Sequence, residues 1–146
     1  MPVKFEVLGV PVGKGRPRFS TQGGFVRAIT PEKTANYETL VRLSYQQKYA
    51  GCMFEKDIPL RAIIRAFFPI PKSASKKKQE QMRDLRILYT KKPDADNIIK
   101  AVLDALNGVA YYDDSQVAEV VISKAYAEQP KVMIELHEIG DIYAKR

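Results

Sequence analysis

The sequence predicts a single α+β domain, with strands near both ends of the chain and helices between them. Its 146 residues are enough for one domain with its own core but too few for two. Four segments have the alternating or β-branched pattern of strands, whereas two have apolar residues at helical spacing. With 45% hydrophobic and 28% charged residues, the composition is that of a folded globular protein and excludes a disordered chain.

The first third of the chain predicts a strand, a loop, a hairpin and a helix. Residues 3–8 alternate as a strand, and residues 9–18 repeat Gly and Pro too often for a regular element. Residues 19–29 form a hairpin that turns at Gln22-Gly23-Gly24. A helix of about 18 residues follows, because Thr30 can cap it, Pro31 suits its first position and Glu32 favours the positive end of its dipole. Gly51 ends it.

The rest of the chain predicts three strands and two helices. Residues 60–68 alternate as a strand that ends at Pro69. Residues 73–85 suggest a short, very basic surface helix. Apolar positions from Ile98 to Leu106 share one face of a second helix, which Asn107-Gly108 closes. Residues 117–127 and 131–138 are the last strands, and residues 140–146 are expected to be a C-terminal tail beyond a domain that spans residues 1–139.

The charge of the chain points toward a polyanionic partner. Lys and Arg total 24 against 17 acidic residues, which gives a net charge of +7 and a pI near 9.5. Such a balance favours nucleic acid, although a solvated basic face is the simpler alternative. Positive charge is concentrated between residues 72 and 100, which hold nine basic residues and only four acids.

Other features of the sequence restrict location and chemistry. No apolar run approaches the roughly 20 residues that a membrane span needs, and the N-terminus lacks an apolar signal segment. We therefore expect a cytoplasmic protein. Cys52 has no second cysteine to pair with and no histidine near it in sequence, so we interpret it as an incidental thiol.

A group of carboxylates is the main candidate for a functional site. Asp94 and Asp96 stand where a helix begins, and Asp96, Lys100 and Asp104 lie within a sector of about 80° on that helix. After the turn at Gly108, a short return can bring Asp113-Asp114 back toward Asp94 and Asp96. The alternatives remain open: Asp94 as a simple cap, Lys100 as an i,i+4 ion-pair partner, and residues 112–115 as a surface turn.

Three converging carboxylates would need a cation to offset their repulsion. Oxygen ligands without His or Cys suit Mg²⁺ or Mn²⁺, and such an ion can activate water against a phosphodiester. Lys100 is placed to contact the phosphate, with Lys91 and Lys92 nearby. We interpret Asp104 as a structural residue of the helix and not as a ligand.

Several motifs resemble the RusA-type Holliday junction resolvases of bacteria and prophages. The resemblance runs through Lys92-Pro93-Asp94-Ala95-Asp96-Asn97, through residues 100–108 and through Asp113-Asp114-Ser115-Gln116. Residues 13–18 and 70–73 also look like the phage-type branch. Ala95 replaces the bulkier Leu that often separates the two acids of the motif, and the loop between Leu106 and Asp113 varies in length among relatives.

The resemblance implies a mixed β-sheet with flanking helices and a two-fold homodimer. It implies that Asp94, Asp96, Asp114 and Lys100 are catalytic. The three acids would bind Mg²⁺ or Mn²⁺, with Asp113 as a further candidate ligand. Such enzymes nick two strands of a four-way DNA junction symmetrically. Two rivals remain: a looser structure-selective nuclease acting on forks, flaps or Y-junctions, and a non-catalytic protein that binds branched DNA.

In a junction-cutting enzyme, basic residues beside the site would contact the DNA backbone. The candidates are Lys14, Arg16, Arg18, Arg27, Lys72, Lys76, Lys77, Lys78, Lys91 and Lys92. Three aromatic residues, Phe19, Phe25 and Tyr111, could instead wedge against unstacked bases, but packing in the core or at a dimer contact is the preferred interpretation.

Overall fold

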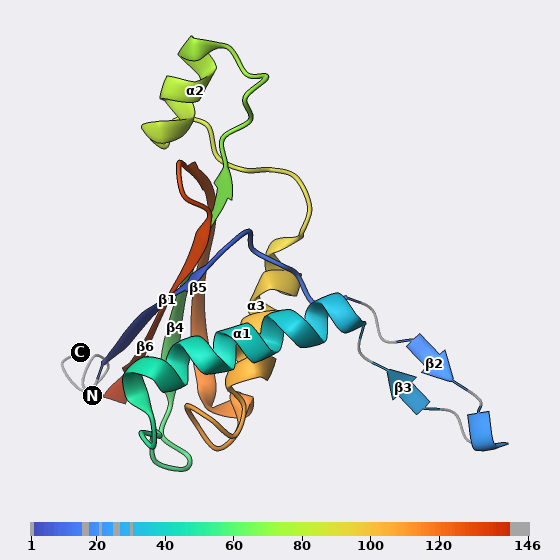
Figure 1. Ribbon diagram of the computed structural model, residues 1–146. Coiled ribbons are helices and arrows are strands. Elements are labelled where there is room, and N and C mark those ends of the chain that lie inside the picture. The colour runs from blue at the N-terminus through green and yellow to red at the C-terminus, as the bar shows by residue number, and fades with distance from the viewer. Residues whose placement is uncertain (1, 16–17, 21, 25–26, 30, 141–146) are drawn as a thin grey trace.

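The computed structural model describes residues 2–15, 18–20, 22–24, 27–29 and 31–140, although it does not describe the side chains of residues 18–20, 22 and 27–29. The strands are β1 (Val3–Leu8), β2 (Arg18–Ser20), β3 (Arg27–Ile29), β4 (Leu60–Pro69), β5 (Val117–Ala127) and β6 (Lys131–Glu138). The helices are α1 (Glu32–Tyr49), α2 (Lys76–Arg83) and α3 (Ala95–Leu106), with short 3₁₀ turns η1 (Gln22–Gly24) and η2 (Asp114–Gln116) (Figure 1).

The main sheet is mixed, with strand order β1-β6-β4-β5. β1 and β4 both pair with β6 in antiparallel fashion, whereas β4 and β5 run parallel, and Ile64 stands opposite Ile134 on one side and Ile122 on the other. β2 and β3 form a separate hairpin. These findings confirm the predicted single α+β domain with a mixed sheet. The two-fold homodimer stays a prediction, because one chain is described.

The core lies between one face of the sheet and the helices α1 and α3. Alternate residues of β1, β4 and β6 are buried, as period-2 alternation requires. The helices contribute their apolar faces, with Val41 from α1 and Val102 from α3 both inaccessible to solvent. Each large side chain buried in this way stabilises the fold by about 1.5–3 kcal/mol. Packing of α1 against α3 over the sheet fixes the helix that carries the candidate site.

The helices begin and end within a few residues of the predicted positions. α1 spans 18 residues, its N-cap position is Pro31, and Gly51 follows its end at φ 75°. Thr30, the predicted cap, lies outside the described residues. α2 is shorter than the predicted helix over residues 73–85. It begins after Ser75, whose Oγ accepts a hydrogen bond from the Lys78 N–H at 3.2 Å. It ends before Leu85, whose φ of 63° is outside the right-handed helical region.

The basic helix α2 stands apart from the α1–α3 layer, beyond the ends of β4 and β5 (Figure 1). The β2–β3 hairpin projects from the other side, next to the start of α1. In the described ranges no helix is both long and apolar enough to cross a bilayer. Cys52 is a half-buried free thiol.

Candidate active site

Asp94 begins α3 but does not cap it with its side chain. The N–H groups of Asn97 and Ile98 donate to the Asp94 backbone carbonyl at 3.1 and 3.2 Å, which starts the helix. The Asp94 carboxylate accepts no capping hydrogen bond, and the residue is exposed. The carboxylate is therefore open to solvent at the positive end of the helix dipole, where negative charge is favoured, and the alternative of a simple side-chain cap is wrong.

Three charged residues follow one another along the same side of α3. Asp96 is exposed in the first turn, Lys100 lies one turn further, and Asp104 lies one turn beyond that. Of the two possible i,i+4 pairs, only that between Lys100 Nζ and Asp104 Oδ2 falls within ion-pair distance in the described structure, at 3.8 Å. The Lys100 side chain is 64% exposed, so its ammonium group faces solvent.

Gln116 fixes the turn that carries Asp113 and Asp114. Its side-chain oxygen accepts hydrogen bonds from the N–H groups of Tyr112 and Asp113 at 3.0 and 3.2 Å. Its nitrogen donates to the carbonyl oxygens of Glu55 and Ile58 at 2.9 and 3.1 Å. The residue is 8% exposed. The acidic turn is thus held against a segment about sixty positions earlier. Tyr112, Asp113 and Ser115 are exposed, so the alternative of a surface turn stays open.

The two acids of this turn differ in environment. Asp113 is the N-cap of η2, and a hydrogen bond from the Ser115 hydroxyl holds the pKa of its carboxyl group below the usual value. Burial raises the pKa of Asp114, and the charges of Asp113 and Asp104 raise it further, although Lys100 acts in the opposite direction. Asp114 is therefore the acid of the pair that is coupled to α3.

The three predicted metal-binding acids do not converge on one point. Among the described residues, no three acidic, His or Cys side chains are grouped closely enough to hold an ion. The charges that act on Asp114 are those of Asp113, Asp104 and Lys100. Asp96 lies about 12 Å before Asp104 along the axis of α3. The segment that follows α3 and carries Asp114 therefore comes first to the last turns of this helix, where Asp104 lies. In the described structure these three acids are not grouped around one point, and their joint binding of a metal stays a prediction.

The chemistry of the donors still fits a hard divalent ion. Mg²⁺ is often bound by one or two carboxylates, with waters and substrate phosphate completing its coordination. Asp94 and Asp96 offer two exposed carboxylates at the start of α3, and Asp114 offers a partly exposed carboxylate on which the charge of Lys100 acts. These residues could hold such an ion together with a phosphate.

The loop before Asp94 is held by contacts that the sequence did not reveal. The ring of Tyr89 stacks on Phe68 of β4 with 3.6 Å between ring centroids, and its hydroxyl donates to the Lys92 carbonyl at 2.7 Å. Lys124 of β5 donates to the carbonyl oxygens at positions 91 and 93. No local pattern could have identified Phe68 and Lys124, because each contacts this loop from a strand more than twenty positions away.

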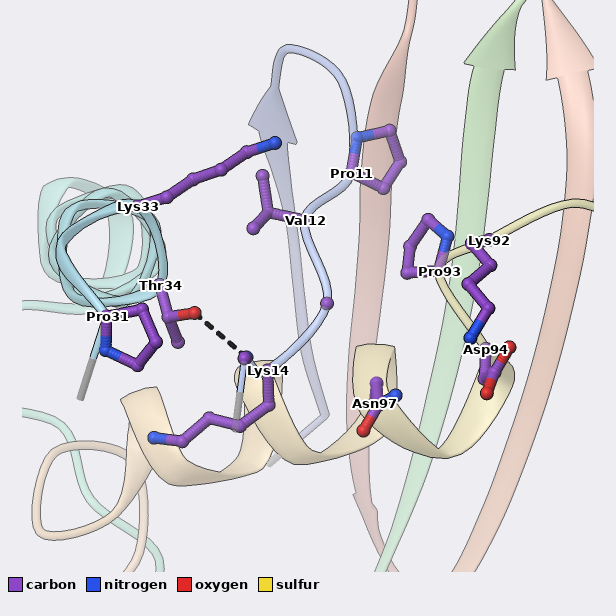
Figure 2. Close-up of a pocket in the computed structure, with 12 residues that line it drawn as sticks. Pro11, Val12, Lys14, Pro31, Lys33, Thr34, Lys92, Pro93, Asp94 and Asn97 are labelled. Carbon is purple, nitrogen blue, oxygen red and sulfur yellow. Dashed lines mark hydrogen bonds between the residues drawn. The ribbon is translucent and has the colours of Figure 1, made fainter. Parts of the chain in front are cut away.

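A pocket of about 450 Å³ adjoins Asp94, between the start of α1, residues 11–15 and the start of α3 (Figure 2). Its polar lining includes Lys33, Lys92 and Asn97, and prolines form much of its apolar wall. Lys33 is a candidate phosphate contact that sequence reasoning missed, because only the packing of α1 beside α3 brings it to the same pocket as Asp94, on the opposite side.

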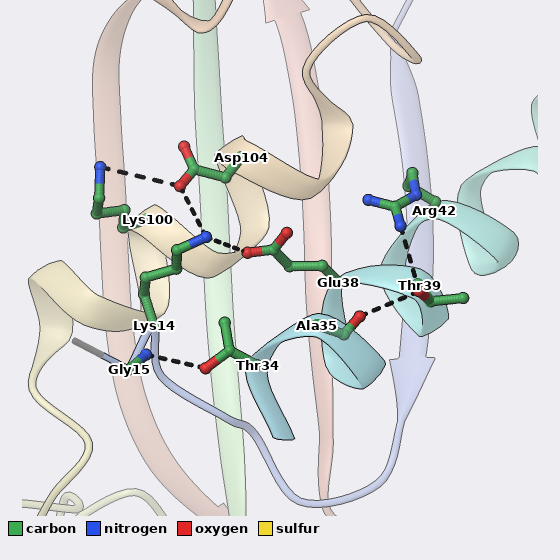
Figure 3. A network of polar contacts seen from close by, with 9 residues as sticks. All are labelled: Lys14, Gly15, Thr34, Ala35, Glu38, Thr39, Arg42, Lys100 and Asp104. Atoms are coloured by element: carbon green, nitrogen blue, oxygen red, sulfur yellow. Dashed lines mark hydrogen bonds and ion pairs between the residues drawn. The ribbon is translucent and has the colours of Figure 1, made fainter. Parts of the chain in front are cut away.

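Lys14 lies between the two helices. Its ammonium group contacts Glu38 of α1 and lies 3.3 Å from Asp104 Oδ2 of α3 (Figure 3). The side chain is 15% exposed. Burial lowers its pKa, but hydrogen bonds and charges from Glu38 and Asp104 outweigh this effect and raise it overall. This placement argues against the predicted contact between Lys14 and DNA.

The other predicted DNA contacts divide into three groups. Lys72, Lys76, Lys77, Lys78, Lys91 and Lys92 are exposed, as a DNA-contacting role requires. Arg16 and Phe25 lie outside the described residues. The side chains of Arg18, Phe19 and Arg27 are also not described. Tyr111 is fully buried and donates to the Leu103 carbonyl, so it belongs to the core and cannot wedge between bases.

Comparison with known proteins identifies the family of the chain. The family model described as endodeoxyribonuclease RusA matches residues 9–137. An uncharacterized protein of Bacillus subtilis, YqaN, is 38% identical over 140 residues, which cover 94% of this chain and 97% of that protein. The crossover junction endodeoxyribonuclease rusA of Lactococcus phage r1t is 29% identical over 140 residues, or 95% and 92% of the two chains. The chain therefore belongs to the RusA family and is an endodeoxyribonuclease.

Proposed function

We propose that this enzyme resolves Holliday junctions by metal-dependent hydrolysis of phosphodiester bonds, at the start of α3, where Asp94 is the N-cap residue and Asp96 and Lys100 share one side of the helix. The observation that carries the proposal is the exposed Lys100 ammonium group, one helical turn from Asp96 and electrostatically coupled to Asp114. The phage relative, named as a crossover junction endodeoxyribonuclease, supports the choice of substrate.

Asp94, Asp96 and Asp114 are the proposed ligands of Mg²⁺ or Mn²⁺, and Asp113 is a further candidate. When bound, the ion supplies Lewis-acid polarisation of the phosphodiester and a more acidic water. Because the charge of Lys100 acts on Asp114, we expect the substrate phosphate to complete the site between Asp114 and the acids at the start of α3. In-line attack by water would leave 3′-hydroxyl and 5′-phosphate ends.

Three lysines bind and position the phosphates of the DNA. Lys100 neutralises a non-bridging oxygen of the scissile phosphate and offsets the charge that develops in the transition state. Lys92 and Lys33, which line the pocket beside Asp94, hold neighbouring phosphates.

A wider basic surface binds the arms of the junction. It comprises the exposed lysines of α2 and of the segment before it, Lys72, Lys76, Lys77 and Lys78, together with Lys91. Arg16, Arg18 and Arg27, whose side chains lie outside the described structure, are further candidates from the sequence. α2 stands well away from α3, so a DNA arm contacted by α2 would extend from the active site along β4 and β5. Contacts of this kind set affinity and orientation without reading sequence.

Paired nicking requires two active sites. A four-way junction has approximate two-fold symmetry, so a two-fold homodimer would present one α3 to each of two strands. Sedimentation of the protein with and without junction DNA tests this part of the proposal, and a monomer in both states would contradict it.

A panel of substrates tests the function. The protein is incubated with Mg²⁺ and end-labelled four-way, three-way, forked and linear duplex DNA, each also with EDTA. Symmetric nicks in the four-way junction, little cutting of linear duplex and no cutting in EDTA are expected. Equal cutting of forks, flaps and Y-junctions would favour the looser nuclease, and equal cutting of linear duplex would overturn the resolvase assignment.

A further inference from the structure

We propose that Lys14 is a positioning residue: it occupies the Asp104 carboxylate and thereby keeps the Lys100 ammonium group available for the DNA phosphate. The inference rests on the proposed function only in taking Lys100 as the lysine that contacts the substrate. It gives Lys14 a role inside the protein, in place of a direct contact with DNA.

One carboxylate oxygen is shared by two lysines. Asp104 Oδ2 lies 3.3 Å from Lys14 Nζ and 3.8 Å from Lys100 Nζ (Figure 3). The first distance is close to that of a hydrogen bond, whereas the second is beyond it. The Lys14 side chain is 15% exposed and that of Lys100 is 64% exposed. Asp104 is thus engaged mainly by the buried lysine and holds the exposed one only loosely.

Two backbone hydrogen bonds fix the orientation of the chain at Lys14. The Lys14 N–H donates to the Asn97 carbonyl of α3 at 2.8 Å, and the Gly15 N–H donates to Thr34 Oγ1 of α1 at 2.9 Å. These two hydrogen bonds tie the loop to both helices. The side chain between them is consequently aimed into the space between α1 and α3.

The glycines on either side of Lys14 permit this close approach. A Cβ atom at Gly13 would stand 2.6 Å from Pro93 Cβ, and one at Gly15 would stand 2.9 Å from Pro31 Cγ. Both distances are too short for carbon atoms in contact. The Gly-Lys-Gly sequence therefore lets the loop pass tightly between the two helices, with the lysine pointing inward.

The charges in this group are balanced. Glu38 and Asp104 supply two negative charges, and Lys14 and Lys100 supply two positive charges. A partly buried carboxylate that loses its partner is costly. Without Lys14, the described residues within ion-pair distance of Asp104 would include only one cation, Lys100. Lys100 would then close onto Asp104 and withdraw from the position where it meets the phosphate.

The first test is the substitution Lys14→Met. Cleavage of a four-way junction at saturating DNA is expected to slow by roughly tenfold or more, because a charge that stabilises the transition state is withdrawn. Junction affinity should change little. The double variant Lys14→Met/Asp104→Asn should recover most of the lost rate, because Asp104 no longer attracts Lys100. A residue needed only for folding would not be rescued in this way.

A second readout does not depend on activity. The reactivity of the Lys100 amine toward an acylating reagent, measured by mass spectrometry without DNA, should fall in Lys14→Met and recover in the double variant. The matched control is Lys131→Met, which removes a lysine of 27% exposure at the start of β6 that is paired with Glu6 of β1 at 3.1 Å. This control should change neither cleavage nor Lys100 reactivity.

If Lys14→Met does not fold, the variant Lys14→Gln/Glu38→Gln keeps the charges balanced and still removes the lysine from Asp104. The same outcomes are expected of it. Wild-type cleavage together with unchanged Lys100 reactivity would overturn the inference, as would failure of Asp104→Asn to restore the rate. If wild-type protein cut no junction, the proposed function would fail, yet Lys100 reactivity would still report on Lys14.

Discussion

The Lys124 ammonium group donates a hydrogen bond to the Pro93 carbonyl oxygen at 3.0 Å, and so connects β5 with the loop that leads directly into Asp94. The same ammonium group donates to the carbonyl oxygen at position 91, at 2.9 Å. Because Asp94 starts α3, this anchor sets where the first carboxylate of the site stands relative to the sheet.

The substitution Lys124→Met should loosen this loop. We expect a loss of about 1.5–3 kcal/mol in the free energy of unfolding, the usual contribution of a hydrogen bond that involves a charged group. Cleavage should fall by more than junction affinity does, since Asp94 is displaced while the basic surface is kept. Urea denaturation and a cleavage assay measure the two effects, and Ser123→Ala, at an exposed neighbouring position, is the control. Unchanged cleavage would mean that the anchor has no role in the site.

The spacing of apolar residues and of turn residues along the sequence was enough to predict most of the helices and strands. β5 and β6 begin and end at the predicted residues because alternation and the turn at residues 128–130 are local signals. Helical spacing likewise placed Asp96, Lys100 and Asp104 on one side of α3. The parts that could not be predicted depend on crossings between distant elements. Lys14 meets Asp104 only because α1 packs on α3, and the return of Asp114 is set by how far the turn after α3 reaches.

Removal of the Gln116 side-chain amide should destabilise the acidic turn. The substitution Gln116→Leu leaves two N–H donors and two carbonyl acceptors without this partner, and we expect a loss of about 2–3 kcal/mol in the free energy of unfolding. Chemical denaturation with an unchanged m-value measures it. The exposed Gln129 gives a matched control, since Gln129→Leu should have little effect. Equal stability of both variants would show that the Gln116 contacts contribute nothing.

The two acids of the turn should respond to pH with opposite signs, measured in EDTA so that no ion binds. The pKa of Asp114 is raised in the fold, chiefly by burial, so its ionised form costs stability above that pKa. Asp114→Asn should therefore increase stability near neutral pH. The pKa of Asp113 is lowered, chiefly by the Ser115 hydrogen bond, so its ionised form adds stability that is lost as pH falls.

Asp113→Asn should accordingly decrease stability near neutral pH. Both differences from wild type should vanish as the pH falls below the ordinary aspartate range near 3.8. Thermal or urea unfolding across this range measures them. Effects of the same sign for Asp113→Asn and Asp114→Asn would contradict the different environments of the two acids.

The lysines of α2 should contribute to affinity without contributing to sequence preference. The triple variant Lys76→Gln/Lys77→Gln/Lys78→Gln should weaken binding to every branched DNA alike. It should also reduce the slope of log K against log salt by up to about 3, close to one unit for each lost phosphate contact. Fluorescence anisotropy at several salt concentrations measures the slope.

A scattered variant, Lys4→Gln/Lys56→Gln/Lys131→Gln, removes the same charge from the β1–β6 side of the sheet and from the loop before β4, and serves as the control. An equal change of slope in both triple variants would mean that net charge alone, and not the position of α2, determines binding.

The substitution Asp96→Asn tests the central claim most directly, because it removes one negative charge from α3 and leaves the shape of the site nearly unchanged. Cleavage and binding are measured on the same end-labelled four-way junction, in Mg²⁺ for cleavage and in EDTA for binding. The proposed site predicts a loss of cleavage of roughly 10²-fold or more, with affinity within about twofold of wild type. Cleavage at the wild-type rate by Asp96→Asn would show that the α3 carboxylates do not form the active site.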